Sequence, residues 1–230
     1  MRDHGGNIDG AIARFGGSGW IDLSTGINRV PYPLPVLHPD DWTMLPTASA
    51  KAALLDVARK AYDTKAPTLA VAGAQAAIQM IPRLQAPGQA RVLGPTYNEH
   101  AAALRHAGWQ VQEVTQPGQL AGADLAVMVN PNNPDGSRHS PADLLALAAQ
   151  VGRLVVDESF ADADPALSLA PLAGPERLLI LRSFGKFYGL AGVRLGFVLG
   201  SQADIAALEA MAGPWPVSGA AIRVGSVALA

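Results

Sequence analysis

Short apolar runs alternate with helical patterns over most of the chain, and this alternation restricts the fold more than any other feature. Apolar runs predict buried strands at 91–93, 109–114, 125–129, 154–156, 178–181 and 194–199. Helical patterns are expected at 47–62, 74–83, 97–107, 141–151 and 202–212, with Ser140 and Ser201 as caps of the last two. Strands and helices in this order form a mainly parallel sheet with helices on both faces. We therefore predict one α/β domain over residues 46–230.

Composition excludes several classes of protein. The 230 residues are 49% hydrophobic with a net charge of -2, which is typical of a globular protein and gives no basic surface for nucleic acid. Cysteine is absent, so disulfides and thiolate chemistry are excluded. The polar N-terminus lacks a signal-peptide core, and no apolar run is long enough to cross a bilayer. A cytoplasmic protein without membrane partners is expected. The five histidines do not have metal-ligand spacing, so no metal site is expected.

The first 45 residues are rich in glycine and proline. Pro31, Pro33 and Pro35 alternate with other residues, a pattern that favours extended backbone. Residues 1–45 are therefore predicted to form an irregular arm in front of the α/β domain.

A glycine-rich apolar run from Ser183 to Gly196 carries Lys186 and Arg194. A lysine shielded from water loses part of its preference for the charged form, and an uncharged amine can form a Schiff base with a carbonyl. The serine hydroxyl and the arginine suit a phosphate. An aldehyde and a phosphate on one small molecule describe pyridoxal 5'-phosphate (PLP). The plain alternative is a buried lysine in a loop between strands.

Asp157 follows the apolar run at 154–156, at the sheet edge where ligands of such folds bind. A buried carboxylate needs a cationic partner. The pyridinium nitrogen of PLP would be that partner, and the carboxylate would keep the ring protonated as an electron sink. The segment also fits the acidic strand of an ATPase, but no G-x-x-x-x-G-K-[ST] run accompanies it. An ordinary acid in a turn at the end of a strand is the remaining alternative.

The run from Ser183 to Gly196 closely resembles the cofactor-lysine motif of class I/II aminotransferases, which are fold-type I PLP enzymes. This resemblance implies the large domain of a PLP-dependent transferase, assembled as a homodimer. It implies that Asn133 contacts the ring's phenolic oxygen and that Tyr97 stacks on the ring. By the resemblance, Lys186 and Asp157 are catalytic, and the cofactor-binding residues are Gly73, Ala74, Gln75, Tyr97, Asn133, Asp157, Ser183, Lys186 and Arg194.

Within that family, the segments at 4–7, 22–28 and 95–102 resemble the threonine-phosphate decarboxylases of cobalamin biosynthesis. The resemblance implies decarboxylation of L-threonine O-3-phosphate to (R)-1-amino-2-propanol O-2-phosphate. It also implies substrate contacts by His4, Gly5, Gly26 and Asn133. The sequence does not show whether the Cα–carboxylate or the Cα–H bond is aligned for cleavage, so an aminotransferase of the histidinol-phosphate type is the alternative. An idle PLP-binding protein and an ordinary α/β domain also stay open.

The sequence departs from the family pattern at three points. Leu45, before Pro46, stands where relatives often supply a tyrosine to the phosphate site of the partner subunit. Phe160 stands where many relatives carry a tyrosine that donates to the cofactor ring. The sequence ends at Ala230, before the small C-terminal domain that carries a carboxylate-binding arginine in relatives. That small domain is therefore expected to be absent or truncated.

Overall fold

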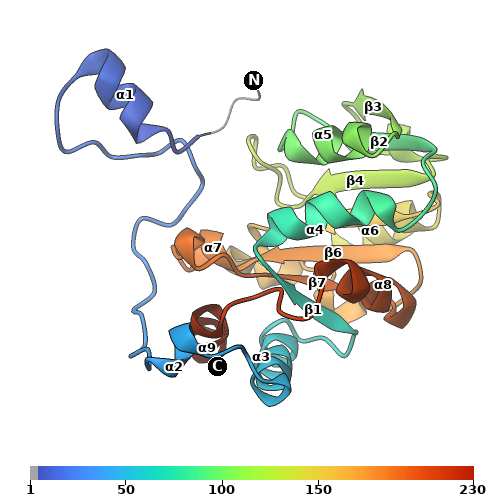
Figure 1. Cartoon of the computed structure of the whole chain (residues 1–230). Coiled ribbons are helices and arrows are strands. Elements are labelled where there is room, and N and C mark those ends of the chain that lie inside the picture. Colours follow the sequence, from blue (N-terminus) through green and yellow to red (C-terminus); the bar gives the residue numbers. More distant parts are fainter. Residues whose placement is uncertain (1–4) are drawn as a thin grey trace.

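The computed structural model describes residues 5–230, which build a seven-stranded sheet with helices around it (Figure 1). The strand order is β1-β7-β6-β5-β4-β2-β3. The strands are β1 (Thr68–Val71), β2 (Gln89–Leu93), β3 (Gln110–Val114), β4 (Leu125–Val129), β5 (Leu154–Asp157), β6 (Leu178–Ser183) and β7 (Gly196–Leu199). Only β7 runs antiparallel to its neighbours, β1 and β6. The predicted α/β class with a mainly parallel sheet is confirmed.

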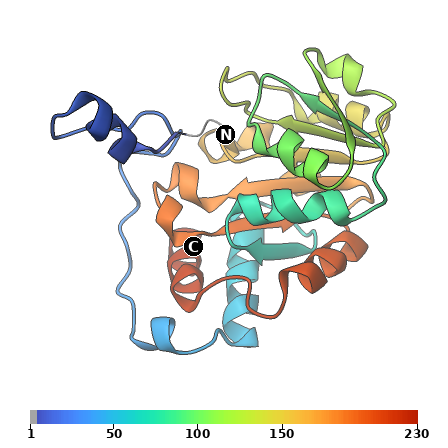
Figure 2. The ribbon, with the colours of Figure 1, turned by 45° about the horizontal axis from the view of Figure 1, so that its top comes forward.

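Helices cover both faces of the sheet (Figures 1 and 2). A separate apolar cluster lies under each set of helices. One face carries α4 (Ala74–Met80), α5 (Glu99–His106) and α8 (Gln202–Ala212). The other carries α3 (Ala48–Ala61), α6 (Pro141–Ala148) and α9 (Gly219–Ala228). The domain is therefore a three-layer sandwich in which both sheet faces are buried.

Alternation along the strands decides which face each polar residue reaches. On β5, Val155 belongs to the cluster under α4 and α5, and Val156 belongs to the opposite cluster. Successive side chains of a strand point to opposite faces, so Asp157 faces the α5 side and Glu158 the other. By the same rule, Arg182 near the end of β6 lies on the face of Glu158.

Two helix starts predicted from the sequence have their expected caps. The Ser140 side chain accepts a hydrogen bond from the backbone of Asp143 at the start of α6. The Ser201 side chain does the same for Asp204 at the start of α8. Each cap satisfies one of the backbone N–H groups that the first turn of a helix leaves without a partner.

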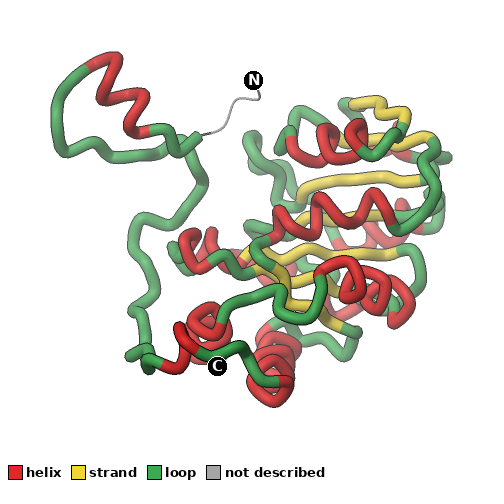
Figure 3. The backbone as a smooth tube through the Cα atoms, in the orientation of Figure 1, coloured by secondary structure: helices red, strands yellow, loops and turns green. Residues whose placement is uncertain are grey.

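The N-terminal segment stands away from the sheet and then passes down one side of the domain to α3 (Figures 1 and 3). The prediction of an irregular arm is wrong at α1 (Ile8–Phe15), because the Asn7 side chain accepts from Gly10 and caps a helix there. A single turn, α2 (Asp40–Thr43), precedes α3. Elsewhere between residues 5 and 45 there is no helix or strand. Across residues 5–230, no helix combines the length and the apolar character that crossing a membrane requires.

Candidate active site

One pocket opens beyond the carboxyl ends of the parallel strands, where α4 and α7 (Phe184–Phe187) approach the sheet. The structure brings together in its lining all nine residues that the sequence suggested for cofactor binding: Gly73, Ala74, Gln75, Tyr97, Asn133, Asp157, Ser183, Lys186 and Arg194. These residues come from five separate segments of the chain. Because the fold brings these residues together, they can contact one bound molecule.

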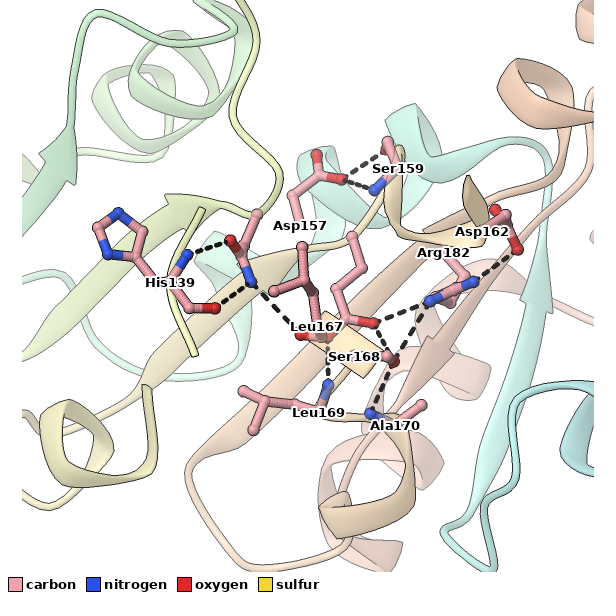
Figure 4. Close-up of polar contacts among 11 residues, drawn as sticks. His139, Asp157, Ser159, Asp162, Leu167, Ser168, Leu169, Ala170 and Arg182 are labelled. Atoms are coloured by element: carbon pink, nitrogen blue, oxygen red, sulfur yellow. Dashed lines mark hydrogen bonds and ion pairs between the residues drawn. The ribbon is translucent and has the colours of Figure 1, made fainter. Parts of the chain in front are cut away.

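Asp157 closes β5 and is only 3% exposed. His100 Nε2 lies 2.8 Å from Asp157 Oδ2. The backbone N–H of Ser159 donates to Oδ1 at 2.9 Å, and the Ser159 hydroxyl donates to the same oxygen (Figure 4). Burial raises the pKa of Asp157, but the hydrogen bonds and charge of His100 and the bonds from Ser159 outweigh it and hold the pKa below its ordinary value. The carboxylate is therefore kept ionised inside the protein.

Lys186 lies in the one-turn helix α7, directly after β6. Its ammonium nitrogen is 5.9 Å from the ring centre of Phe160. Burial lowers the pKa of Lys186, the charge of Asp157 opposes this shift, and the charge of Arg194 adds to it. A lowered pKa leaves more of the amine uncharged near neutral pH, which is the form that attacks a carbonyl.

Another part of the pocket lining is built from the backbone at Gly73 and the guanidinium of Arg194. A Cβ on Gly73 would lie 2.7 Å from Arg194 Nη2, and Gly73 has a φ of +75°. Glycine is required there by both space and conformation. Arg194 itself has a left-handed φ of 55°, which costs energy and is typical of residues held in place for a function. Among residues 5–230, no carboxylate lies within ion-pair distance of Arg194, so its charge is available to a ligand.

Gln75 of α4 and Tyr97, which stands two residues before α5, belong to the lining of the pocket. Gln75 donates to Glu99 at 2.8 Å and accepts from the Tyr97 hydroxyl at 3.3 Å. The Tyr97 ring meets His100 edge to face, with ring centres 6.1 Å apart. Tyr97 therefore presents a braced aromatic ring to the pocket, next to the residue that holds Asp157.

A buried ionic network supports the site from the other face of the sheet (Figure 4). Arg182 donates to Glu158 at 2.9 Å and to Asp162 at 2.6 Å. Glu158 also accepts from the Ser168 hydroxyl at 2.5 Å and from the Leu169 backbone at 2.6 Å. The network joins the loop that follows Asp157 to the strand that leads to Lys186.

The N-terminal arm lies against the segment that carries Lys186. The Asn28 backbone donates to the carbonyl of Lys186 at 3.0 Å, and its side chain donates to the carbonyl of Phe187 at 2.9 Å. A Cβ on Gly26 would lie 2.8 Å from the ring of Phe160. The arm is thus fitted closely to the mouth of the pocket.

The residues suggested for substrate binding are not all in one place. Asn133 lines the pocket and Gly26 packs on Phe160 at its mouth. Gly5 lines a separate hollow within the arm, next to Asn7 and Ser24. His4 falls outside the described residues.

Sequence reasoning missed the roles of His100 and Ser159. His100 stands three residues after Tyr97, a spacing that places two side chains on the same side of a helical turn. Ser159 stands two residues after Asp157, a spacing at which a hydroxyl and a carboxylate regularly meet in a turn. These two spacings were the signals present in the sequence.

The residues present fit PLP. Lys186 offers an amine of lowered pKa for the aldehyde, and Asp157 offers a buried anion for the pyridinium nitrogen. Arg194 and the glycine turn at Gly73 offer a cation and close backbone approach for the phosphate. Tyr97 adds an aromatic side chain to the lining of the same pocket.

Comparisons with known proteins agree with this geometry. The model of the family described as aminotransferase class I and II matches residues 44–230. The threonine-phosphate decarboxylase of Pseudomonas aeruginosa is 43% identical over all of this chain and 71% of its own length. That of a Sinorhizobium species is 44% identical over 96% of this chain and 69% of its own length.

A solved structure shares the fold. The L-threonine-O-3-phosphate decarboxylase of Porphyromonas gingivalis superimposes with a TM-score of 0.73 at 22% identity, over 83% of this chain and 64% of that chain. This chain therefore spans about two thirds of the length of the relatives it matches. The match of the family model over most of the chain shows that the chain belongs to the class I and II aminotransferase family, whose members use pyridoxal 5'-phosphate.

Proposed function

We propose that this chain catalyses the PLP-dependent decarboxylation of L-threonine O-3-phosphate to (R)-1-amino-2-propanol O-2-phosphate, a reaction of cobalamin biosynthesis. The observation that carries the proposal is the meeting of Lys186, Asp157 and Arg194 in one pocket. The proposed substrate is inferred from the threonine-phosphate decarboxylases named above, which are 43% and 44% identical to this chain.

Three residues of the pocket lining would each contact a different part of PLP. Lys186 would join the aldehyde carbon of PLP, because burial favours its uncharged form. Asp157 would accept a hydrogen bond from the ring nitrogen and keep it protonated, because His100 and Ser159 hold the carboxylate ionised. Arg194 would contact the phosphate together with backbone N–H groups at the start of α4.

When bound, PLP supplies a cationic ring that takes up the electron pair left by the departing carboxylate. Lys186 is the candidate acid that returns a proton to Cα, since it lies inside the pocket and can carry a proton there. Asn133, which lines the pocket, would donate a hydrogen bond to the phenolic oxygen of PLP. Gly26 would leave room for substrate beside Phe160. A larger residue at this position would collide with the Phe160 ring.

A homodimer in the cytoplasm is part of the proposal. The arm exposes large apolar side chains by at least 60% each: Leu23, Val30, Leu34, Val36, Trp42 and Met44. Apolar surface of this extent favours a protein partner, and a second copy would bury it next to the pocket. Both phosphorylated compounds, cofactor and substrate, are typical of the cytoplasm. Sedimentation analysis should give twice the 23.8 kDa chain mass, and a monomer at micromolar concentration would refute the dimer.

The activity is tested by loading the chain with PLP and adding L-threonine O-3-phosphate labelled with ¹⁴C at the carboxylate. Release of labelled carbon dioxide with formation of the aminopropanol phosphate supports the proposal. Lys186→Ala serves as the matched inactive variant. Formation of a keto acid when pyruvate or 2-oxoglutarate is present, without carbon dioxide, would indicate an aminotransferase instead. No turnover by the loaded chain would contradict the proposed activity.

A further inference from the structure

Ser159 makes two contacts with a single oxygen of Asp157. Its backbone N–H donates to Oδ1 at 2.9 Å, and its hydroxyl donates to the same atom. Ser159 is 8% exposed, and it also belongs to the lining of the pocket. The hydroxyl is therefore placed beside the cofactor site but is directed at the carboxylate.

The acceptor capacity of the carboxylate explains what this contact does. An ionised carboxylate has about four directions in which its oxygens accept hydrogen bonds, two on each oxygen. Within residues 5–230, Ser159 fills two on Oδ1 and His100 fills one on Oδ2. The direction left for a further donor is therefore on Oδ2.

We propose that Ser159 is a positioning residue that saturates Oδ1 of Asp157 and so directs Oδ2 toward the ring nitrogen of PLP. This inference rests on the proposed cofactor. Without the hydroxyl, Oδ1 gains a free acceptor direction and the carboxyl group can rotate away from the pocket. Burial then acts on a carboxylate with fewer donors and favours its neutral form. A neutral carboxyl group binds the cationic nitrogen less tightly.

The chain contains a matched copy of this local geometry on its surface. Ser137 donates to Oδ1 of Asp135 through its backbone at 3.0 Å and through its hydroxyl at 2.5 Å, and both residues are exposed. Ser137→Ala therefore removes the same type of hydrogen bond at a place that does not line the pocket. It controls for the general effect of deleting a hydroxyl from this type of turn.

The test measures dissociation constants for two cofactors in the purified full chain. One is PLP, and the other is 1-deazapyridoxal 5'-phosphate, in which carbon replaces the ring nitrogen. Ser159→Ala should raise the dissociation constant for PLP about tenfold, which is the size expected for a lost hydrogen bond to a charged group. The same variant should change the affinity for the deaza compound by less than about twofold, because Asp157 has no N–H to accept from it. Ser137→Ala should leave both affinities unchanged.

Two results would overturn the inference. If Ser159→Ala weakens the binding of both cofactors equally, Ser159 has a general structural role. If PLP binding is unchanged or tighter, Ser159 has no positioning role. Thermal unfolding of the variants without PLP checks that they fold. Ser159→Cys, which keeps a weaker donor of similar shape, should show an intermediate loss of affinity for PLP and no change for the deaza compound. Failure of the unaltered chain to bind PLP at Lys186 would instead refute the proposed function, so the two failures are distinguishable.

Discussion

His100 and Asp157 meet inside the protein with Nε2 and Oδ2 2.8 Å apart, although 57 residues separate them in the sequence. Both side chains are at most 4% exposed. The pair joins the first turn of α5, which begins two residues after Tyr97, to the end of β5. It holds a buried carboxylate in the charged form that a cationic ligand requires.

Replacing His100 by Asn should lower the free energy of unfolding by about 2 kcal/mol at pH 7, because a buried carboxylate loses a hydrogen-bond donor. The pKa of Asp157 lies below the ordinary 3.8 in the folded protein, so its stabilising effect is present above pH 3.8 and is lost as the pH falls through the folded pKa. In the variant, burial dominates and raises that pKa. Urea unfolding at several pH values should show a loss that is largest at neutral pH and shrinks toward pH 4.

His106→Asn is the control for this prediction, because His106 ends the same helix and is exposed. It should change the free energy of unfolding by less than about 0.5 kcal/mol. If the loss of unfolding free energy in His100→Asn does not vary between pH 7 and pH 4, the loss does not come from the ionisation of Asp157.

Replacing Arg182 by Met should destabilise the fold by about 3–5 kcal/mol, because two buried carboxylates lose their cation. Adding Glu158→Gln and Asp162→Asn should recover part of that loss. Arg138→Met removes an exposed pair with Asp164 and should cost less than about 1 kcal/mol. Denaturant unfolding measures all of these, and equal effects of the Arg182 and Arg138 variants would be inconsistent with a supporting role of the buried network.

Replacing Gly189 by Ala should force the arm away from the lysine segment. Gly189 has a φ of +66°, and a Cβ there would lie 2.7 Å from the carbonyl oxygen of Asn28 and 2.8 Å from Pro31 Cα. We expect a loss of about 2 kcal/mol in unfolding free energy and faster protease cleavage at residues 29–39.

Gly192→Ala is the matched control for the arm contact. A Cβ at Gly192 would meet nothing within 4 Å, so its effect should stay within about 0.5 kcal/mol with unchanged cleavage. Equal cleavage rates in the Gly189 and Gly192 variants would show that the arm is not held by this contact.

The core of the fold was predictable because local patterns and the final packing agree. Six of the seven strands and the capped helices α6 and α8 follow from apolar runs and from Ser140 and Ser201. β1 (Thr68–Val71) was missed, because its apolar residues run on through Ala72 and Gly73 into the alanine-rich start of α4. β7 begins at Gly196 rather than at 194, because the left-handed backbone of Arg194 interrupts the extended chain.

The helices α1 and α9 were missed for different reasons. α1 lies among glycines, and only the Asn7 cap marks its start. α9 contains two glycines, which weaken a helical pattern, and packing against α3 stabilises it instead.

Candidate site residues were predictable where they stand in recognisable motifs, as Lys186 and Asp157 do. His100 acts by its contact with Asp157, and a contact between segments 57 residues apart cannot be inferred from either segment alone. The placement of the arm also depends on packing, because Gly26 and Asn28 meet Phe160 and Lys186 only in the folded chain.

The central claim is that Lys186 binds PLP covalently, and borohydride reduction followed by peptide mapping tests it most directly. The sequence contains four lysines, and the other three, Lys51, Lys60 and Lys65, lie in or just after α3. The account predicts one pyridoxyl group per chain, on the peptide that carries Lys186, and none in Lys186→Ala. A modified Lys51, Lys60 or Lys65 in place of Lys186, or no adduct after reduction with excess PLP, would contradict it.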